Sequence, residues 1–330
     1  MILVTGANGL VGAAIVRCLL KNKQVVRALK RSNSDVSSLA DLETQIEWVE
    51  GDVLDINSLE AAMVGVSQVV HTAAMVFFSP KLRHQMYKVN VEGTANVVNV
   101  CMAMGVKKLA FVSSIAAIGR PDVNQVDFQK TIHINEEQKW EDSPLNSHYA
   151  KSKYQAELEV WRGAAEGLPA VIVNPSIILG EGDWTRSSTQ LFKYVYDQNK
   201  FYTQGLVNYV DVLDVAAITV QLLLSDIENE RFVLNAGTTT YKDLFEQIAQ
   251  GFNQKAPSIG ISPFMSEILW RIEAIRSFFT GKNPLITRET AKSARTRFVY
   301  DTDKIQKKIN FSFIPLSQTI KRVTDGIKNK

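Results

Sequence analysis

The sequence predicts an α/β protein built on a doubly wound parallel sheet, with a smaller C-terminal substrate lobe. Strand-like and helix-like patterns alternate from the first residues to about Asn174, as expected when helices connect parallel strands. A glycine-rich turn directly follows the first apolar run, and this order of strand, turn and helix is typical of dinucleotide binding. The chain has 330 residues, of which 45% are hydrophobic, so it can bury one large core and an attached lobe.

The first element is a buried strand over residues 2–5, followed by the glycine-rich turn and a helical pattern. Gly6 permits the tight turn, Gly9 lets a pyrophosphate approach the backbone, and Gly12 lets the helix pack closely on the sheet. The amides at the start of the helix then face the anion. Chance glycines would form only a turn, but this position between a strand and a helix favours a Rossmann-type site. We therefore expect a cofactor to contact Gly6, Asn8, Gly9, Leu10, Val11 and Gly12.

The end of the second strand, predicted over residues 24–29, bears on the choice between NAD and NADP. An acidic residue there would bind the ribose 2′-hydroxyl of NAD, but the segment instead continues into Lys30 and Arg31. Charge-assisted hydrogen bonds from Arg31 suit a 2′-phosphate and are worth about 1.5 to 3 kcal/mol each. The first carboxylate, Asp35, is expected to begin the next helix. We therefore predict NADP in preference to NAD; the alternative is that Arg31 belongs to an exposed basic strand end.

The later elements continue the alternation. Strands are predicted over residues 46–49, 69–72, 109–113 and 170–173, and helices over 59–63, 82–104 and 149–166. Residues 209–216 are expected to return to the sheet and enter a helix. Together these elements predict a dinucleotide-binding domain over residues 1–180, completed by 205–235, and a substrate lobe made of 181–204 and 236–330.

Tyr149 and Lys153 stand four residues apart, one helical turn, so both side chains can point into one cleft. A nearby ammonium favours the ionised form of a tyrosine. Moving a tyrosine pKa from about 10 to near neutrality requires roughly 4 kcal/mol, and one charge at about 4 Å supplies about that at an effective dielectric near 20. Alone, this spacing also describes an ordinary surface pair. Its position after a strand that ends at Ser113 and Ser114 indicates a site for proton transfer.

These motifs resemble, in order and in type, those of extended short-chain dehydrogenases/reductases, the NAD-dependent epimerase/dehydratase family. The resemblance covers roughly residues 1–235 and is strongest to the dihydroflavonol reductase and 3β-hydroxysteroid dehydrogenase branch. As in those reductases, 35 positions separate the serine from the tyrosine. It is carried by Gly6, Gly9 and Gly12, Gly51-Asp52-Val53, His71-Thr72-Ala73-Ala74, Asn90-Val91-Glu92-Gly93-Thr94, Ser113-Ser114, the run from Tyr149 to Lys153, and Asn174-Pro175-Ser176.

The resemblance implies a role for each matched position. Ser114 would donate a hydrogen bond to the substrate oxygen, Tyr149 would transfer its proton, and Lys153 would hold the nicotinamide ribose and tune Tyr149. The other expected cofactor contacts are Asp52 and Val53 at the adenine, Ala73 and Ala74 at the central phosphates or ribose, Asn90 as support for the lysine, and Pro175 and Ser176 beside the nicotinamide. Asn90 could equally bind local backbone, and Pro175 could simply end its strand.

Several other features exclude classes of function. His71 ends an apolar strand and is expected to pack rather than to catalyse, and the four histidines make no metal-ligand spacing with Cys18 or Cys101. Two cysteines in helical patterns suit a reducing compartment, and with no signal peptide before the first strand we expect a cytoplasmic protein. No apolar run reaches the length of a membrane span, and no basic stripe with aromatic residues suggests nucleic acid. By analogy with relatives, a homodimer through the 82–104 and Tyr149 helices is expected.

The C-terminal region has two features that the motifs do not explain. Residues 263–280 form an amphipathic pattern that predicts a helix packed on the core, with a lid over an apolar substrate or a membrane-surface contact as alternatives. Residues 280–330 carry a net charge of +8 in a chain whose total is only +3. Solvated helix faces explain most of this excess, although inward-facing Arg288, Arg295 or Arg297 could hold a nucleotide-sugar pyrophosphate.

Three functions follow, in order of preference. The first is an NADP(H)-dependent oxidoreductase that interconverts a secondary alcohol and a ketone on a small, fairly apolar molecule. The second is a nucleotide-sugar epimerase or dehydratase with tightly bound NAD, which uses the same serine, tyrosine and lysine. The third is a non-catalytic NAD(P)-sensing protein, against which the complete proton-transfer set argues.

Overall fold

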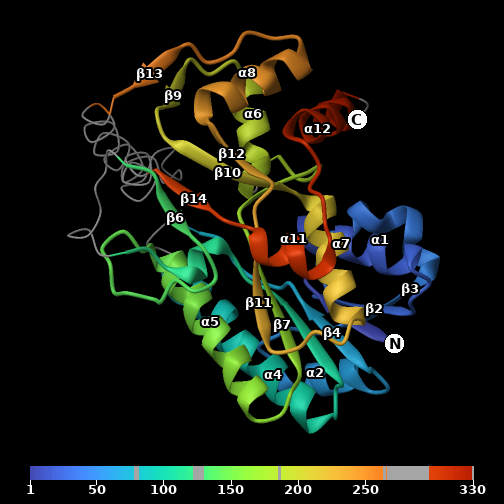
Figure 1. Ribbon diagram of the computed structural model, residues 1–330. Helices are drawn as coiled ribbons and strands as arrows, with labels where there is room; N and C mark the ends of the chain where they lie inside the picture. The colour runs from blue at the N-terminus through green and yellow to red at the C-terminus, as the bar shows by residue number, and fades with distance from the viewer. Residues whose placement is uncertain (78–81, 122–129, 185–186, 263–264, 266–296, 329–330) are drawn as a thin grey trace.

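The computed structural model describes residues 1–77, 82–121, 130–184, 187–262, 265 and 297–328. Its centre is a seven-stranded sheet in the order β11-β7-β5-β4-β1-β2-β3, and every pairing in it is parallel (Figure 1). The strands are β1 (Ile2–Thr5), β2 (Val26–Lys30), β3 (Ile46–Glu50), β4 (Gln68–His71), β5 (Lys108–Val112), β7 (Ala170–Pro175) and β11 (Glu230–Leu234).

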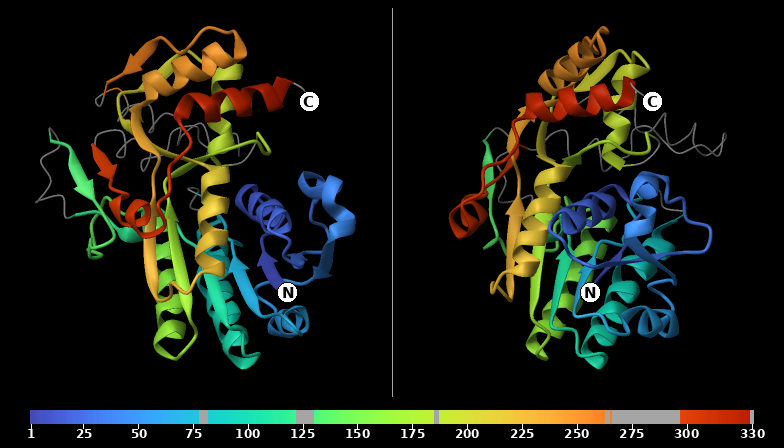
Figure 2. Two further views of the ribbon diagram at one scale, coloured as in Figure 1. Left: turned by 45° about the vertical axis from the view of Figure 1, so that its right-hand side comes forward. Right: turned by 90° about the vertical axis from the view of Figure 1, so that its right-hand side faces the viewer.

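Helices cover both faces of this sheet, and each face has its own apolar core (Figure 2). One core joins the sheet to α1 (Leu10–Lys21) and α7 (Val212–Leu224), with a 3₁₀ helix at Ser37–Gln45 beside them. The other core joins it to α2 (Ile56–Met63), α4 (Gly93–Ala103) and α5 (His148–Ala165). Strands buried on both faces explain the continuous apolar runs in the sequence.

The second lobe lies beyond the carboxyl ends of the strands and has a separate apolar core (Figure 1). Its three-stranded sheet has the order β12-β10-β8. Its strands are β8 (Ile177–Leu179), β10 (Leu206–Asp211) and β12 (Gly237–Thr240), and its helices are α6 (Gln190–Tyr196), α8 (Tyr241–Phe252) and α12 (Leu316–Lys328). The shorter elements are α3 (Arg83–Tyr87), 3₁₀ turns at Ile115–Ile118 and Ser187–Thr189, α11 (Asp303–Ile309), and the paired strands β9 (Phe201–Thr203) with β13 (Ile259–Ile261) and β6 (Ile132–Ile134) with β14 (Phe298–Tyr300).

The structure confirms the predicted fold class and the six predicted strands to within two residues at each end. One expectation needs correction. Residues 209–211 belong to β10 in the small sheet, and within 205–235 it is α7 and β11 that return to the large one. A helix does follow Asp35, a 3₁₀ helix at Ser37–Gln45, and the Asp35 carboxylate accepts a hydrogen bond from the Ser37 amide at 2.9 Å. The predicted amphipathic helix over 263–280, together with Arg288 and Arg295, falls outside the described residues apart from Met265.

The order of the sheet positions the site. Strand order reverses between β1 and β4, and in open parallel sheets ligands bind at such a reversal, beyond the carboxyl ends of the strands. The glycine loop follows β1, Ser114 follows β5, and Pro175 ends β7. The α5 helix begins at His148, so Tyr149 lies in its first turn.

Candidate active site

The glycine loop has space for a ligand at one of its three glycines. Gly6 has a left-handed φ of 68°, and a Cβ there would lie 2.7 Å from the Ala73 nitrogen. A Cβ on Gly12 would overlap the Gly6 carbonyl oxygen, so close packing within the chain explains both of these glycines. At Gly9, by contrast, a Cβ would meet only that same oxygen, at 3.3 Å, among the described residues. The chain restricts Gly9 least of the three glycines, and a pyrophosphate close to the backbone would be a further reason for glycine there, so this loop fits a dinucleotide.

The expected adenine-side residues lie along the neighbouring strand ends. Arg31 directly follows β2 and is exposed, and its backbone amide bonds the Ser34 hydroxyl at 3.2 Å. Asp52 is half-buried after β3, and one of its carboxylate oxygens accepts a hydrogen bond from the Leu54 amide at 3.0 Å. Val53 is buried against Gly93. The structure thus brings Arg31 and Asp52 to the same edge as the glycine loop.

Asn90 makes direct hydrogen bonds to the Met75 backbone and to the Ser152 side chain. It lies in a π-helical turn, Lys88–Glu92, between α3 and α4, so the helix predicted over 82–104 is continuous but widened there. Its amide oxygen accepts from the Met75 nitrogen at 2.7 Å, and its amide nitrogen donates to the Met75 carbonyl and the Ser152 hydroxyl, each at 3.0 Å. Asn90 therefore fastens the segment after β4, with Ala73 and the exposed Ala74, to α5.

Ser114 lies close to Tyr149. The Ser114 hydroxyl accepts a hydrogen bond from the Ala116 amide at 3.2 Å. Burial raises the pKa of Tyr149, and the nearby Ser114 hydroxyl offsets part of that rise. The expected lowering by the neighbouring ammonium does not appear, so at neutral pH the phenol is protonated and able to donate.

The contacts of Lys153 show where its ammonium group is directed instead. Its side chain is 2% exposed, its ammonium lies 4.4 Å from the centre of the Phe111 ring, and it donates to the Val112 carbonyl at 3.1 Å. Burial lowers the pKa of Lys153 to about 8, and the charge of Glu157 opposes that shift. Lys153 thus stays close to its ionisation point on the same helix as Tyr149.

A group of polar residues centred on Glu157 lies next to this lysine, and the sequence patterns alone do not reveal it. Glu157 is buried one turn after Lys153, and its carboxylate binds Ser113, Asn174 and Arg231. The spacing of four between Lys153 and Glu157 was a readable signal, because residues at that distance share a helix face. Arg231 gave no such signal, since it lies 74 positions further along the chain.

Pro175 and Ser176 lie where β7 ends. Pro175 is the last residue of that strand, in register with Leu234 of β11, and Ser176 is buried. Within the described residues the Ser176 hydroxyl has no hydrogen-bond partner, and neither does the side-chain oxygen of Asn174. Because buried polar groups are nearly always satisfied, an unpaired hydroxyl here fits a position beside a bound cofactor.

His71 packs behind this arrangement, with its ring stacked on that of Phe111. It is fully buried, with its two ring nitrogens 2.6 Å from the Thr5 hydroxyl and 3.0 Å from the Thr94 hydroxyl. Burial lowers the pKa of His71 to about 3, and the charge of Lys153 adds to that lowering. In the part of the chain that the structure describes, no cluster of three metal-ligating residues occurs. In the same residues, every helix is too short or too polar to cross a bilayer.

A glycine loop at the strand-order reversal, with a serine after the adjoining strand β5 and a tyrosine and a lysine one turn apart on α5, defines the extended short-chain dehydrogenase/reductase class. The chain belongs to the 3-beta hydroxysteroid dehydrogenase/isomerase family, whose model matches residues 3–258. It is therefore an NAD(P)-dependent enzyme that acts on CH–OH groups as an oxidoreductase, or an epimerase or dehydratase of the same superfamily.

Two curated relatives match most of the chain. Sterol demethylase protein B of Methylococcus capsulatus is 28% identical over 288 residues, covering 86% of this chain and 84% of the relative. A putative dihydroflavonol 4-reductase of Synechocystis is 28% identical over 331 residues, covering 98% and 92%.

Solved structures share the fold over the whole chain. The crystal structure of gox2253 has a TM-score of 0.83 and 29% identity, covering all of this chain and 98% of the other. A UDP-glucose 4-epimerase of Thermotoga maritima with UDP-glucose has a TM-score of 0.78 and 19% identity, covering 99% and 98%.

Proposed function

We propose that the protein is an NADP(H)-dependent oxidoreductase that interconverts a secondary alcohol and a ketone on a small, fairly apolar substrate. The observation that carries this proposal is the placement of Ser114 shortly after β5 and of Tyr149 and Lys153 one turn apart at the start of α5, beyond the end of the sheet where the glycine loop also lies. When bound, the nicotinamide would supply or accept the hydride.

The residues of the chain would perform the remaining steps. The Ser114 hydroxyl would donate to the substrate oxygen and stabilise the charge that develops on it. Tyr149, whose raised pKa keeps its proton at neutral pH, would deliver that proton during reduction and take it back during oxidation. Lys153 would hold the nicotinamide ribose, and Arg31 would bind the 2′-phosphate of NADP. The names of the two relatives, a sterol demethylase protein and a dihydroflavonol reductase, support an apolar polycyclic substrate.

The test is replacement of Tyr149 by phenylalanine. First, a thermal-shift panel of NAD, NADP, sterols, flavonoids and nucleotide sugars identifies a substrate, since a ligand at a hundredfold excess over Kd stabilises the fold by about 2.7 kcal/mol. On that substrate, Tyr149→Phe should lower kcat by about 10² to 10⁴ while the Kd for NADPH changes little, because only proton transfer is lost. Undiminished turnover by Tyr149→Phe would refute the proposed chemistry.

A nucleotide-sugar epimerase or dehydratase is the alternative, supported by the fold shared with UDP-glucose 4-epimerase. Such an enzyme keeps its NAD through the catalytic cycle. Purified protein that retains nicotinamide through gel filtration, and that UDP- or GDP-sugars stabilise while apolar ketones do not, would replace the first proposal by this one. A non-catalytic sensor would show no turnover with any member of the panel and would bring down a stable partner protein.

A further inference from the structure

Glu157 is a buried carboxylate that the proposed reaction does not use. Its side chain is 2% exposed, on the face of α5 that carries Lys153 one turn earlier. One oxygen accepts hydrogen bonds from the Ser113 hydroxyl at 2.8 Å and from the Asn174 amide at 2.9 Å. The other pairs with the Arg231 guanidinium at 3.3 Å. Burying a charge in this way is unfavourable unless all its partners are in place.

Two of these partners lead directly to the serine of the site. The Asn174 amide that binds Glu157 also donates to the Ser114 carbonyl, at 3.0 Å. Ser113, the other donor, is the residue immediately before Ser114. Glu157 therefore holds the turn that carries Ser114 at two points. Asn174 links the Glu157 carboxylate to the Ser114 carbonyl, and Ser113 binds the same carboxylate directly.

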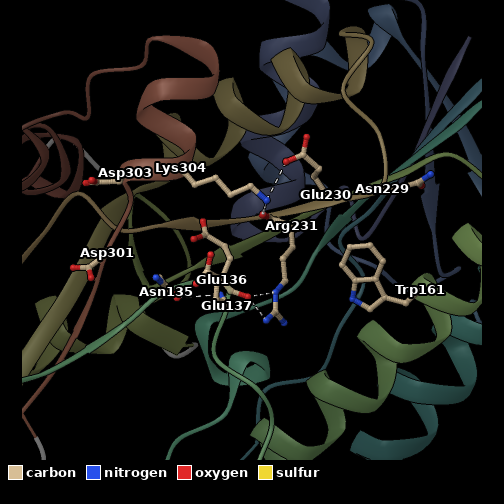
Figure 3. A pocket seen from close by; sticks show the side chains of 10 residues that line it. All are labelled: Asn135, Glu136, Glu137, Trp161, Asn229, Glu230, Arg231, Asp301, Asp303 and Lys304. Carbon is tan, nitrogen blue, oxygen red and sulfur yellow. Dashed lines mark hydrogen bonds and ion pairs between the residues drawn. The ribbon is translucent and has the colours of Figure 1, made fainter.

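The third partner connects Glu157 to the edge of the sheet. Arg231 lies on β11 and also donates to the Glu136 and Gln138 carbonyls. Figure 3 shows its guanidinium directed toward residues 136 and 137, in a hollow of about 720 Å³ that Trp161 and Lys304 also line. The Arg231 side chain is 20% exposed. Its guanidinium therefore stays in contact with solvent while it neutralises the charge of the buried Glu157 carboxylate.

A purely structural role does not explain this choice of residues well. A buried ion pair often stabilises a fold no more than apolar residues of similar volume would. Beside Lys153, however, a negative charge has a specific effect, because burial alone lowers the pKa of this lysine and Glu157 raises it. The carboxylate thus favours the ammonium form, which is the form able to donate to a ribose hydroxyl.

We propose that Glu157 is a positioning residue that keeps Lys153 protonated and fixes the turn bearing Ser114, with Arg231 balancing its charge. The inference rests on the proposed function, because it assigns to Lys153 the role of cofactor ligand. Glu157 itself touches neither substrate nor cofactor in this proposal.

The experiment follows the ionisation of Lys153 through cofactor binding and needs no knowledge of the substrate. Kd values for NADPH are measured from nicotinamide fluorescence between pH 6 and 10.5 in the intact protein. In the wild type, the affinity for NADPH should fall as pH rises through the pKa of Lys153, and this fall is called the alkaline limb of the profile. The limb should be absent in Lys153→Met. In Glu157→Gln the limb should move to lower pH by a unit or more. In Arg231→Met, which removes a positive charge and keeps Glu157, the limb should move to higher pH.

The matched control is Glu159→Gln, which removes a carboxylate from the same helix. Glu159 is 30% exposed and pairs with Arg162 rather than with the buried group, so the limb should stay in place. Shifts of opposite sign for Glu157→Gln and Arg231→Met support the inference, because a general loosening of the fold would move both variants in one direction. If the limb of Glu157→Gln coincides with that of the wild type, or if both variants shift alike, the inference is overturned.

The failure of the inference can be separated from failure of the proposed function. If the alkaline limb persists in Lys153→Met, ionisation of this lysine does not control NADPH binding. Lys153 is then not the cofactor ligand, and the inference about Glu157 is overturned as well. Opposite shifts together with unimpaired turnover by Tyr149→Phe would leave the role of Glu157 standing and refute the proton-transfer chemistry alone. Melting temperatures of all variants establish that the shifts belong to folded protein.

Discussion

At the scale of single residues, burial sets the chemistry of the site. Tyr149 is half-buried and Lys153 is buried, and this partial or complete loss of water moves the pKa of the phenol up and that of the amine down, to about 8. At neutral pH the phenol therefore holds its proton, and most of the lysine remains charged. This is the combination needed to donate a proton to a ketone oxygen while a cation binds a ribose.

Arg31 carries the predicted preference for NADP, and its replacement tests that preference. Loss of one or more charge-assisted bonds to a 2′-phosphate in Arg31→Ala should raise the Kd for NADPH about tenfold to a hundredfold and leave the Kd for NADH unchanged. Nicotinamide fluorescence titrations measure both constants. Lys21→Ala is the control, because Lys21 is an exposed cation at the far end of α1. Equal losses for NADPH and NADH in Arg31→Ala would contradict the assignment.

At the scale of elements, side chains from the sheet terminate α7. The last carbonyls of a helix have no partners within it and must be satisfied from elsewhere. The buried Lys108, the first residue of β5, donates to the Leu222 carbonyl at 2.7 Å and to the Ser225 carbonyl at 2.6 Å. Gln68 of β4 donates to the Leu223 carbonyl at 3.0 Å. These bonds fix α7 on the sheet and with it the start of β11.

Replacement of Lys108 by methionine should therefore destabilise the protein. The substitution keeps the apolar part of the side chain but removes a charged donor from both carbonyls and leaves that of Ser225 without a donor among the described residues, since Ser225 itself still donates to the Leu222 carbonyl. The free energy of unfolding should therefore fall by about 1 to 3 kcal/mol. Urea unfolding followed by circular dichroism measures the change. Lys107→Met is the matched control, since Lys107 is exposed and should tolerate the change within about 0.5 kcal/mol. A Lys108→Met midpoint equal to that of Lys107→Met would disprove the capping role.

The elements differ in how well the sequence predicts them. Alternating apolar runs and helical patterns identified the strands and helices of the large sheet, because burial on both faces demands such runs. The same reasoning could not place residues 209–211, since an apolar strand pattern does not state which sheet the strand joins. The strand at Glu230–Leu234 was not predicted individually because its pattern is weak: it begins with two charged residues and lies at the edge of the sheet.

Within the site, the motif positions were readable because each required a particular residue type after a strand. Ser114 follows β5 and Tyr149 and Lys153 lie one turn apart on α5, as the motifs indicated, and the glycines occupy the expected turn. The buried residues that hold these side chains in place could not be predicted from the sequence. Glu157 and Arg231 are joined by a contact between residues 74 positions apart, and Asn90 binds the Met75 backbone through a widened helical turn. Long-range partners of this kind depend on packing, which a single sequence does not reveal.

At the scale of the whole molecule, the C-terminal segment ties the second lobe to the sheet domain. Arg322 of α12 binds both carboxylate oxygens of Asp211 at 2.7 Å, and Asp211 in turn caps α7 through the Leu213 amide at 2.8 Å. The Asp214 carboxylate accepts from the Ile314 amide at 2.9 Å. Burial raises the pKa of Asp214 to about 6, and the charge of Asp211 adds to the rise.

This raised pKa makes stability depend on pH. The folded protein binds a proton at Asp214 more readily than the unfolded chain, so the contribution of Asp214 falls as pH rises from about 4 to 6. Asp214→Asn keeps an acceptor for Ile314 without the charge. The stability of this variant relative to wild type should be lowest near pH 4 and rise by at most about 3 kcal/mol by pH 6.5. Denaturation curves between pH 4 and 7.5 measure this difference, and Asp226→Asn, at an exposed carboxylate, is the control. A difference that does not change with pH would refute the assignment.

The strand order also determines how the chain is assembled as it is synthesised. The first strand made, β1, lies between β2 and β4, and the last strand of the large sheet ends at Leu234. At translation rates of about 5 to 20 residues per second, roughly 10 to 50 seconds separate their emergence from the ribosome. Until β11 is made, the incomplete sheet leaves apolar strand edges unpaired, so this topology exposes the nascent chain to aggregation for that interval.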